Sequence, residues 1–456
     1  MNVHFIAVGG SAMHNLAIAL ARKGYRVTGS DDEIFEPSRT RLAKEGILPE
    51  KEGWYPERIG SDLDAVIVGM HARADNPELL RAKELGLKIY SFPEFLYEQS
   101  KNKKRVVIGG SHGKTTITSM ILHVLKSNNL PADFMVGALL EGFDVMVKIT
   151  EDAPVMILEG DEYLTSPLDP RPKFHVYRPD IALISGIEWD HINVFPTLDN
   201  YVEQFRIFAG LVPADGALVW CGDDPLVRKV AEGVRGKTTS VTYGVPDHMI
   251  EGGVTVLKTE YGKVPLKVFG RHNLLNIEGA RKVCNLLGVD DESFYRSIKT
   301  FKGASRRLET IAESEHCRVF RDFAHAPSKL RATINAVRQQ FPARKLVACI
   351  ELHTYSSLNP EFIRHYAGTM DQADLPVVYF NPHTVALKKL PPLTPEIVKK
   401  AFGNPDLIVF DDSDALLAFL RRQKWQEANL LMMSSGDFNG TDLFALGKEI
   451  TETLYE

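Results

Sequence analysis

The sequence predicts an α/β protein built from parallel, doubly wound sheets. Short apolar runs alternate with helical segments along the chain, a pattern that favours strand–helix–strand units. Glycine-rich turns end two of these runs, one near residue 9 and one near residue 110. A chain of 456 residues can also bury two or three separate cores. We therefore expect three α/β domains, over residues 1–100, 101–302 and 303–456.

The composition excludes several classes of protein. The chain is 44% apolar and 25% charged, as in ordinary globular proteins, and its net charge of -5 argues against nucleic acid as a partner. Its four cysteines lie far apart, which favours reduced buried thiols over a zinc site or a disulfide framework. The first apolar run is too short for a signal peptide, and no run approaches the ~20 residues of a membrane helix. We expect a cytoplasmic protein with no membrane partner; its oligomeric state stays open.

The first region begins with a strand that runs into a glycine turn. Apolar runs predict strands over 3–8, 25–30 and 65–68, with helices over 13–23 and from Pro77 onward, and the polar segment 98–104 is predicted as a linker. The turn at Gly9-Gly10 lacks the full G-x-G-x-x-G pattern, so an ordinary strand–helix turn and a nucleotide site both remain open. Asp31 favours a nucleotide, because a carboxylate after the second strand can accept from a ribose hydroxyl.

The other two regions repeat the alternation. Predicted strands cover 155–159 and 181–184 in the second region, which closes with a helix from Gly270 through Leu287. In the third region we expect strands over 318–323, 345–351, 376–380 and 407–410. The third region has a usual domain size.

A phosphate-binding loop is the strongest local signal. An apolar run from Arg105 leads into Gly110-Ser111-His112-Gly113-Lys114-Thr115-Thr116 and then into a helical segment. Glycines let successive amides face one concavity, the helix N-terminus adds positive charge, and Lys114 reaches the outer phosphates. Thr115 or Thr116 can place a hydroxyl on Mg²⁺. In the longer motif G-x-x-x-x-G-K-[ST] the first glycine would fall at position 108, which is Ile108 here. The alternative to a phosphate-binding loop is a glycine turn before a helix with an incidental lysine.

Two other strand ends carry candidate metal ligands. Glu159 ends a predicted strand, where a carboxylate can complete a Mg²⁺ shell. Asp190-His191 is predicted at the end of a third strand, where a neutral imidazole could take a second metal. A surface histidine is the alternative for His191 alone.

Six motifs in this order resemble the Mur ligases, the ATP-dependent amide-forming enzymes of peptidoglycan assembly. They are G-S-H-G-K-T-T, E-G-D-E, W-D-H, G-R-H-N-L-L-N, R-R-L-E and D-F-A-H-A-P, and they span essentially the whole chain. The resemblance implies an N-terminal Rossmann-like domain for a UDP-sugar, a central P-loop ATPase domain, and a C-terminal Rossmann-like domain that docks the amine. It implies ATP and Mg²⁺, for which Mn²⁺ can substitute. The implied reaction activates the carboxylate of UDP-N-acetylmuramate as an acyl phosphate, which an amine then opens.

The resemblance also implies roles for individual residues. Lys114, His191 and Arg307 would be catalytic, and Thr115, Glu159 and His191 would bind metal. The implied ATP-binding residues are Gly110, Ser111, His112, Gly113, Lys114, Thr115, Thr116, His272, Asn273, Asn276, Arg307 and Asp322. The implied UDP-sugar residues are Gly9, Gly10, Ser11, Met13, Ser30, Asp31 and His71, and His325 and His353 would face the amine. Helix capping is the alternative for the 272–276 group, and a solvated basic turn is the alternative for Arg306-Arg307. No lysine lies between Lys173 and Lys229 to serve as the carbamylated metal bridge of several Mur ligases.

Two branches of the family differ in the amine that they add. One adds L-alanine; the other recycles the tripeptide L-Ala-γ-D-Glu-meso-diaminopimelate. Glu162-Tyr163, the K-F-H-V-Y run from Lys173 and the D-F-A-H run from Asp322 look like the tripeptide branch, whereas the alanine branch has D-E-S-D and D-Y-G-H. The H-A-P-S run from His325 departs from the H-H-P-T of both branches, and residues 351–357 match neither.

The tripeptide ligase is thus the first hypothesis and the alanine ligase the second. A nucleotide-sugar binding protein whose ATPase only switches its conformation is a candidate of another class. A ligase of the folate polyglutamate type is disfavoured by the N-terminal Rossmann-like region.

Overall fold

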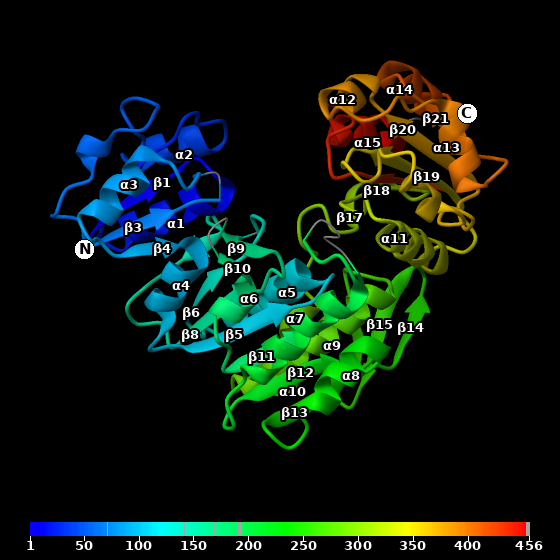
Figure 1. The fold of residues 1–456 in the computed structure, drawn as a ribbon. Coiled ribbons are helices and arrows are strands. Elements are labelled where there is room, and N and C mark those ends of the chain that lie inside the picture. Colours follow the sequence, from blue (N-terminus) through cyan, green and yellow to red (C-terminus); the bar gives the residue numbers. More distant parts are fainter. Residues whose placement is uncertain (71, 141, 167–168, 190–193, 453–456) are drawn as a thin grey trace. The chain divides into compact units, whose positions relative to one another are not determined.

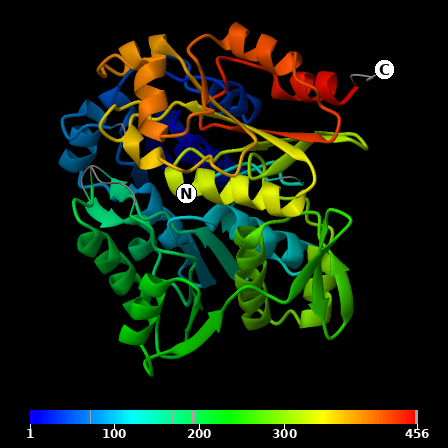
Figure 2. The same ribbon diagram turned by 90° about the vertical axis from the view of Figure 1, so that its right-hand side faces the viewer.

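The computed structural model describes residues 1–70, 72–140, 142–166, 169–189 and 194–452. It divides into two compact units, one of Met1–Pro246 with Leu275–Ile298 and one of Asp247–Leu274 with Lys299–Glu456. The course of the chain through the sheets of each unit can be followed in Figure 1 and, from a second direction, in Figure 2. The α/β class predicted from the sequence is confirmed, since the main sheets are largely parallel.

The N-terminal sheet of the first unit has the parallel strand order β2-β1-β3-β4. Its strands are β1 (Asn2–Ile6), β2 (Arg26–Ser30), β3 (Ala65–Val68) and β4 (Ile89–Ser91), and its helices are α1 (Ser11–Arg22), α2 (Ser38–Lys44), 3-10 helix η1 (Pro56–Arg58), α3 (Pro77–Glu84) and α4 (Phe92–Ser100). The strand order reverses between β1 and β3, which is where open α/β sheets bind ligands. The glycine turn after β1 lies at this point.

The central sheet of the first unit has the order β13-β12-β11-β5-β8-β6-β7, with only β7 antiparallel to its neighbour. Its strands are β5 (Lys104–Gly109), β6 (Ala132–Met135), β7 (Val147–Lys148), β8 (Val155–Glu159), β11 (Ile181–Ile184), β12 (Ala217–Cys221) and β13 (Thr239–Tyr243). A small hairpin pairs β9 (Leu164–Ser166) with β10 (Asp169–Pro172). The helices are α5 (Lys114–Ser127), α6 (Lys173–Val176), α7 (Leu198–Gly210), α8 (Pro225–Gly233), α9 (Arg271–Leu286) and α10 (Asp291–Ile298).

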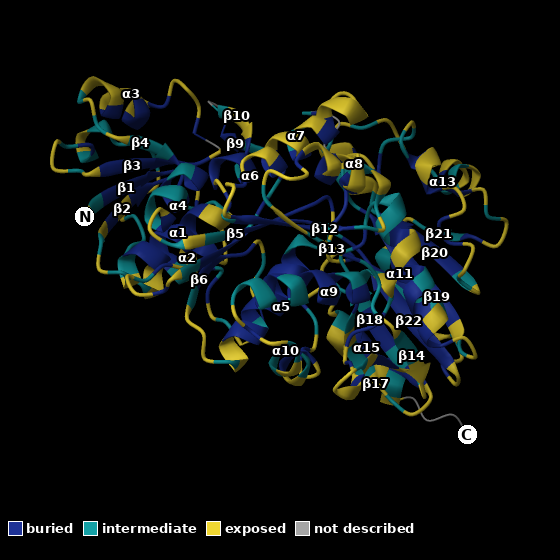
Figure 3. Ribbon diagram, turned by 90° about the horizontal axis from the view of Figure 1, so that it is seen from below, coloured by how far each residue is buried: buried dark blue, intermediate teal, exposed yellow. Residues whose placement is uncertain are grey.

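Apolar runs are buried in this sheet because helices cover it. Phe174 of α6 stacks on Phe208 and meets Phe205 of α7 edge-on, and the three rings belong to one core with Val107 and Ala182 of the strands. Figure 3 shows the result, with buried strands beneath helices whose outer faces are exposed. β5 lies between β11 and β8, so the loop that follows β5 lies beside the ends of both neighbours.

The predicted linker over 98–104 is mostly regular structure. Residues 98–100 form the last turn of α4, and Lys104 already belongs to β5. Lys103 is held because its ammonium donates to Asp133 at 2.7 Å and to two backbone carbonyls. Residues 101–103 form the short connection between α4 and β5, and Lys103 anchors it to Asp133. The domain boundaries remain predictions.

The second unit contains a sheet of order β17-β18-β22-β19-β20-β21, parallel except for β17. Its strands are β17 (Glu309–Glu313), β18 (Cys317–Asp322), β19 (Lys345–Leu352), β20 (Leu375–Phe380), β21 (Ile408–Phe410) and β22 (Ala428–Met433). Its helices are α11 (Pro327–Gln340), 3-10 helix η2 (Ile363–Tyr366), α12 (Pro382–Leu387), α13 (Pro395–Phe402), α14 (Ser413–Arg421) and α15 (Leu443–Glu452).

Alternate residues of β19 explain the two layers of helices. Ala348 packs in a core with α11 and α13, whereas Cys349 packs in a second core with α14 and α15. The sequence analysis missed β22 in the middle of this sheet and edge strand β17. It also missed an antiparallel sheet, β14 (His248–Glu251), β15 (Val254–Thr259) and β16 (Gly262–Pro265), which belongs to the same unit.

Candidate active site

The predicted phosphate loop joins β5 to α5. Gly110 and Gly113 have φ angles of 136° and 80°, where a side chain would be strained. A Cβ at Gly113 would also lie 2.5 Å from Oδ1 of Asn276 on α9. Asn276, predicted to face ATP, therefore lies directly against the loop, although 162 positions separate it from Lys114 in sequence.

Lys114 is the cation at the centre of this loop. Its ammonium donates to the Gly110 carbonyl at 2.6 Å and forms an ion pair with Glu162, also at 2.6 Å. Burial disfavours its charge, but Glu162, Asp161 and Glu159 outweigh burial, so the pKa of Lys114 is raised. The amine is therefore a permanent ammonium in a carboxylate-rich setting. Asp161 is itself paired with Lys173, at 2.5 Å.

The two threonines of the loop differ in their surroundings. The hydroxyl of Thr115 donates to Glu159 Oε1 at 2.8 Å, while Glu159 Oε2 accepts from the Gly137 amide at 2.7 Å. The structure thus brings together Thr115 and Glu159, the two residues predicted to share a metal. Thr116, the next residue in the first turn of α5, is also buried.

Ser111 and His112 shape the loop from the side of β11. The Ser111 hydroxyl lies 2.8 Å from the hydroxyl of Tyr201 and accepts from the Glu188 amide at 2.8 Å. A Cβ at Gly186 would lie 2.2 Å from the His112 ring, so only glycine allows this approach. The Ser111 hydroxyl thus connects the loop to α7 and to the segment after β11.

The glycine turn of the N-terminal sheet is held by Asp31. The Asp31 carboxylate accepts from the Gly9 amide at 2.6 Å, and a Cβ at Gly9 would lie 2.9 Å from it. Burial raises the pKa of Asp31 to about 6. The hydrogen bond from Gly9 lowers this pKa, and the neighbouring Asp32 raises it further. Gly10 precedes α1, Met13 and Ser30 are buried beside the turn, and Ser11 is exposed at the start of α1.

Two predicted residues of the second unit, Arg307 and Asp322, lie at the end of β18. Asp322 is half-buried and accepts from the amides of Leu308 and Ala324. Burial raises the pKa of Asp322, while the charge of Arg307 opposes this shift. The Arg307 guanidinium lies 4.9 Å from the centre of the Phe323 ring. Asn273 donates to the Phe269 carbonyl at 2.9 Å, and the ring of His272 lies against Gly270.

His325 and His353 contact different loops of this unit. His325 Nδ1 lies 2.8 Å from the Phe323 carbonyl, and Tyr366 donates to the His325 carbonyl. His353 lies 3.7 Å from Glu351. A Cβ at Gly436 would lie 2.7 Å from the His353 ring, so the loop after β22 approaches this histidine closely.

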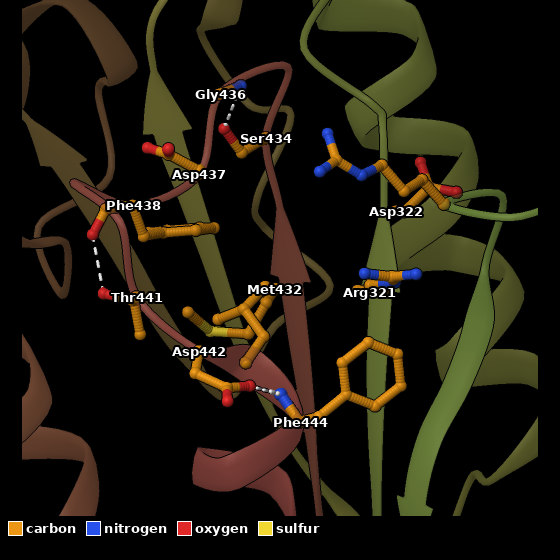
Figure 4. Close-up of a pocket in the computed structure, with 12 residues that line it drawn as sticks. Arg321, Asp322, Met432, Ser434, Gly436, Asp437, Phe438, Thr441, Asp442 and Phe444 are labelled. Carbon is orange, nitrogen blue, oxygen red and sulfur yellow. Dashed lines mark hydrogen bonds between the residues drawn. The ribbon is translucent and has the colours of Figure 1, made fainter. Parts of the chain in front are cut away.

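A cavity of about 140 Å³ opens at the ends of β18 and β22, beside that loop. Figure 4 shows Arg321 and Asp322 on one side and Ser434 and Asp437 on the other. Arg321 pairs with Glu309 at 2.7 Å and stacks 4.6 Å from the Phe444 ring. This loop was not predicted from the sequence as part of a site, although the stretch from Ser434 to Gly440, with two glycines after an apolar run, indicates a loop.

His71 and His191, two predicted site residues, lie outside the described residues. Strand β11, the described strand that precedes His191 in the chain, ends at Ile184. Within the ranges that the structure describes, no group of three His, Cys, Asp or Glu side chains could hold a metal. Nor does any helix in those ranges combine the length and apolarity needed to cross a membrane.

A glycine loop between a parallel strand and a helix, with a half-buried lysine at the helix start, defines a phosphate-loop nucleotide-binding fold. Comparison with known families narrows this class. Residues 2–104 match the Mur ligase family catalytic domain, residues 108–284 the Mur ligase middle domain, and residues 306–436 the Mur ligase glutamate ligase domain. The chain belongs to the Mur ligase family and is an ATP-dependent amide ligase.

Individual relatives agree with this assignment. UDP-N-acetylmuramate–L-alanine ligase of Arthrobacter sp. (strain FB24) is 34% identical over 386 residues, which are 82% of this chain and 80% of that protein. The UDP-N-acetylmuramate–alanine ligase structure from Thermotoga maritima has a TM-score of 0.70 at 21% identity and covers 99% of this chain and 98% of that one. The murein peptide ligase structure from Psychrobacter arcticus 273-4 has a TM-score of 0.64 at 22% identity and covers 100% of both chains. The structures at these identities establish a shared fold.

Proposed function

We propose that this enzyme joins the lactyl carboxylate of UDP-N-acetylmuramate to the amine of L-Ala-γ-D-Glu-meso-diaminopimelate. A carboxylate oxygen attacks the γ-phosphorus of ATP, and the bond to the ADP oxygen breaks. The amine nitrogen then attacks the carbonyl carbon of the acyl phosphate, the carbon–oxygen bond breaks, inorganic phosphate leaves, and the nitrogen loses a proton. Residues 1–100 hold the nucleotide sugar, 101–302 the ATP, and 303–456 the amine.

The observation that carries the activation step is the placement of Lys114. The first step brings a carboxylate anion to a phosphate anion, so it needs a fixed positive charge between them. Lys114 supplies one at the start of α5, next to the amides of the glycine loop. Glu162 holds the ammonium in this position before nucleotide binds. Holding the two reacting groups in line can contribute roughly 7–11 kcal/mol more.

The residues around Thr115 fit a Mg²⁺ ion. A threonine hydroxyl and a carboxylate oxygen 2.8 Å apart are hard oxygen donors beside the phosphate loop. Mg²⁺ bound with nucleotide needs only one or two protein ligands, because phosphates and waters fill its other positions. Thr115 and Glu159 would hold the ion, which would neutralise charge on the phosphates when bound.

Support for the tripeptide comes from residues that differ between the two branches and lie in the site. Tyr163 follows Glu162, which pairs with Lys114, and Lys173, the first residue of the K-F-H-V-Y run, pairs with Asp161. His175 of the same run is buried and stacks on Phe174. Lys173 is linked to the site through Asp161, a carboxylate that also acts on the charge of Lys114.

L-alanine is the second candidate amine, favoured by the relatives that are 30–34% identical and bear the name of an L-alanine ligase. Incubation of the protein with ATP, Mg²⁺ and UDP-N-acetylmuramate plus either amine separates the two candidates. We expect ADP release and an amide of the mass of the tripeptide conjugate with the tripeptide only. Product with L-alanine alone would contradict the proposal, and ADP release without any amide would indicate a conformational ATPase instead.

A further inference from the structure

A buried histidine links the N-terminal glycine turn to an arginine. His14 lies on α1, and its Nδ1 is 3.0 Å from the Gly10 carbonyl oxygen and 3.0 Å from the Ser38 hydroxyl. On the other side of the ring, Nε2 lies 3.1 Å from Nη1 of Arg41 on α2 and 3.0 Å from the Asn15 amide nitrogen. The His14 side chain is 2% exposed.

These partners assign the proton on the imidazole. A backbone carbonyl only accepts, so Nδ1 carries the hydrogen, whereas a guanidinium only donates, so Nε2 is the acceptor. His14 is thus neutral. Burial is the main cause that lowers the pKa of His14, and the charge of Arg41 lowers it further, whereas the hydrogen bond to Gly10 acts in the opposite direction. A neutral ring can hold Arg41 in one orientation but cannot compensate its charge.

Arg41 has no carboxylate partner in the part of the chain that the structure describes. Its neighbours in sequence behave differently: Arg39, two positions earlier on α2, forms an ion pair with Glu52. A guanidinium that is half-buried and held by a neutral acceptor keeps its full charge available for an anion. Arginine forks match phosphate oxygens well.

The start of α1 adds to this positive charge. Gly10 precedes the helix, no described side chain caps it, and Ser11 and Ala12 are exposed. Unpaired amides at a helix N-terminus attract anions. Because one imidazole touches both the Gly10 carbonyl and the Arg41 guanidinium, the helix start and the arginine lie on opposite sides of a single ring.

We propose that Arg41 binds the diphosphate of the nucleotide sugar and that His14 is the positioning residue that aims it. The assignment rests on the proposed function, which places the nucleotide sugar at this glycine turn. The Asp31 carboxylate occupies the Gly9 amide, so the uncapped amides at the start of α1 are the ones left for an anion beside Arg41.

UDP and uridine titrations test this assignment, because only UDP carries the diphosphate. The titrations are run by calorimetry on the full chain with a saturating non-hydrolysable ATP analogue, which keeps UDP off the phosphate loop. We expect Arg41→Gln to weaken UDP binding about 10- to 100-fold, the range of a charge-assisted hydrogen bond, and to leave uridine binding unchanged. The matched control Arg39→Gln removes an arginine of the same helix and should leave both affinities unchanged.

His14 variants test the positioning role. His14→Gln keeps an acceptor for Arg41 and should retain most of the UDP affinity, whereas His14→Leu should weaken UDP binding by a smaller factor than Arg41→Gln. In turnover assays, His14→Leu should raise the KM for the nucleotide sugar without lowering kcat. If His14→Leu does not fold, the Arg41 and Arg39 variants still show whether Arg41 binds the diphosphate.

Two results would overturn the inference: equal UDP affinity in wild type and Arg41→Gln, or an equal loss for UDP and uridine. Neither result touches the proposed function, which fails instead if the wild type binds UDP yet forms no amide with either amine.

Discussion

Lys114 and Glu162 form an ion pair 2.6 Å long at the start of α5, where the phosphate loop ends. The pair joins a loop residue to the E-G-D-E segment after β8, 48 positions further along the chain. Glu162 also accepts from the Tyr201 hydroxyl at 3.3 Å, so α7 contributes to holding the carboxylate. The cation of the site is thus fixed by elements from three parts of the central sheet before any substrate arrives.

Replacing Lys114 should abolish most of the activity. Lys114→Ala removes the positive charge that faces the transferred phosphoryl group, and we expect kcat/KM for ATP to fall at least about 100-fold. Steady-state ADP release measures this. Lys126→Ala, at an exposed position of the same helix, is the control and should match wild type. A Lys114→Ala enzyme that retains wild-type turnover would remove the proposed role.

The Thr115 hydroxyl should control the requirement for magnesium. Thr115→Val deletes the donor beside Glu159 but keeps the side-chain shape, so we expect the Mg²⁺ concentration for half-maximal ADP release to rise about tenfold or more. Thr115→Ser keeps the hydroxyl and should stay near wild type. Removal of Mg²⁺ with a chelator should stop turnover in all three proteins. If ADP release by Thr115→Val and by Thr115→Ser depended on the Mg²⁺ concentration in the same way, the Thr115 hydroxyl would not be a Mg²⁺ ligand.

A side chain at Gly113 should disturb both folding and nucleotide binding. Gly113→Ala places a Cβ 2.5 Å from Asn276 at a φ of 80°, and we expect a loss of about 1–3 kcal/mol in the free energy of unfolding. Urea denaturation measures the loss, and ATP affinity should fall with it. Gly210 is the last residue of α7, and a Cβ there would meet nothing within 4 Å. The control Gly210→Ala should therefore leave the free energy of unfolding unchanged.

Arg307 should act on turnover rather than on ATP binding. The residue lies in the second unit with Asp322, where its guanidinium stacks on Phe323. If the third region closes over ATP during turnover, Arg307→Ala should lower kcat far more than it raises the Kd for ATP. Stopped-flow ADP release and equilibrium ATP binding separate the two effects. Arg331→Ala, at an exposed position of α11, serves as the control, and unchanged kcat in Arg307→Ala would exclude the role.

Asp31 should make the unliganded protein less stable as pH rises from 4 to 7. Its folded pKa of about 6 exceeds the ordinary value of 3.8, so the folded state retains a proton that the unfolded state has lost. Between these values stability falls as pH rises. Urea denaturation gives the free energy of unfolding of Asp31→Asn minus that of wild type. This difference should increase by about 1–2 kcal/mol from pH 4 to pH 7. Asp215→Asn, at an exposed position, should show no such change. A stability difference for Asp31→Asn that does not vary with pH would contradict the raised pKa of Asp31.

Contiguous patterns made much of this molecule predictable. The α/β class followed from alternating apolar runs, and the phosphate loop from seven adjacent residues whose backbone and charge requirements are local. β22 was missed although its residues are apolar, because a short buried run does not by itself distinguish strand from helix. The 98–104 segment connects α4 to β5, as a linker would, but its polarity did not reveal the ion pair that Lys103 forms with Asp133.

The sequence by itself determined the family of this protein and the chemistry of its phosphate loop, since those depend on residues a few positions apart. Only the tertiary structure decided that Glu162 pairs with Lys114, that Thr115 rather than Thr116 meets Glu159, and that His14 contacts Arg41. Those relationships join residues up to 48 positions apart, and parallel strand pairing is what brings them within hydrogen-bonding distance. Charge, hydrogen bonding and proton position are properties of such contacts, so they exist only once the sheets have formed.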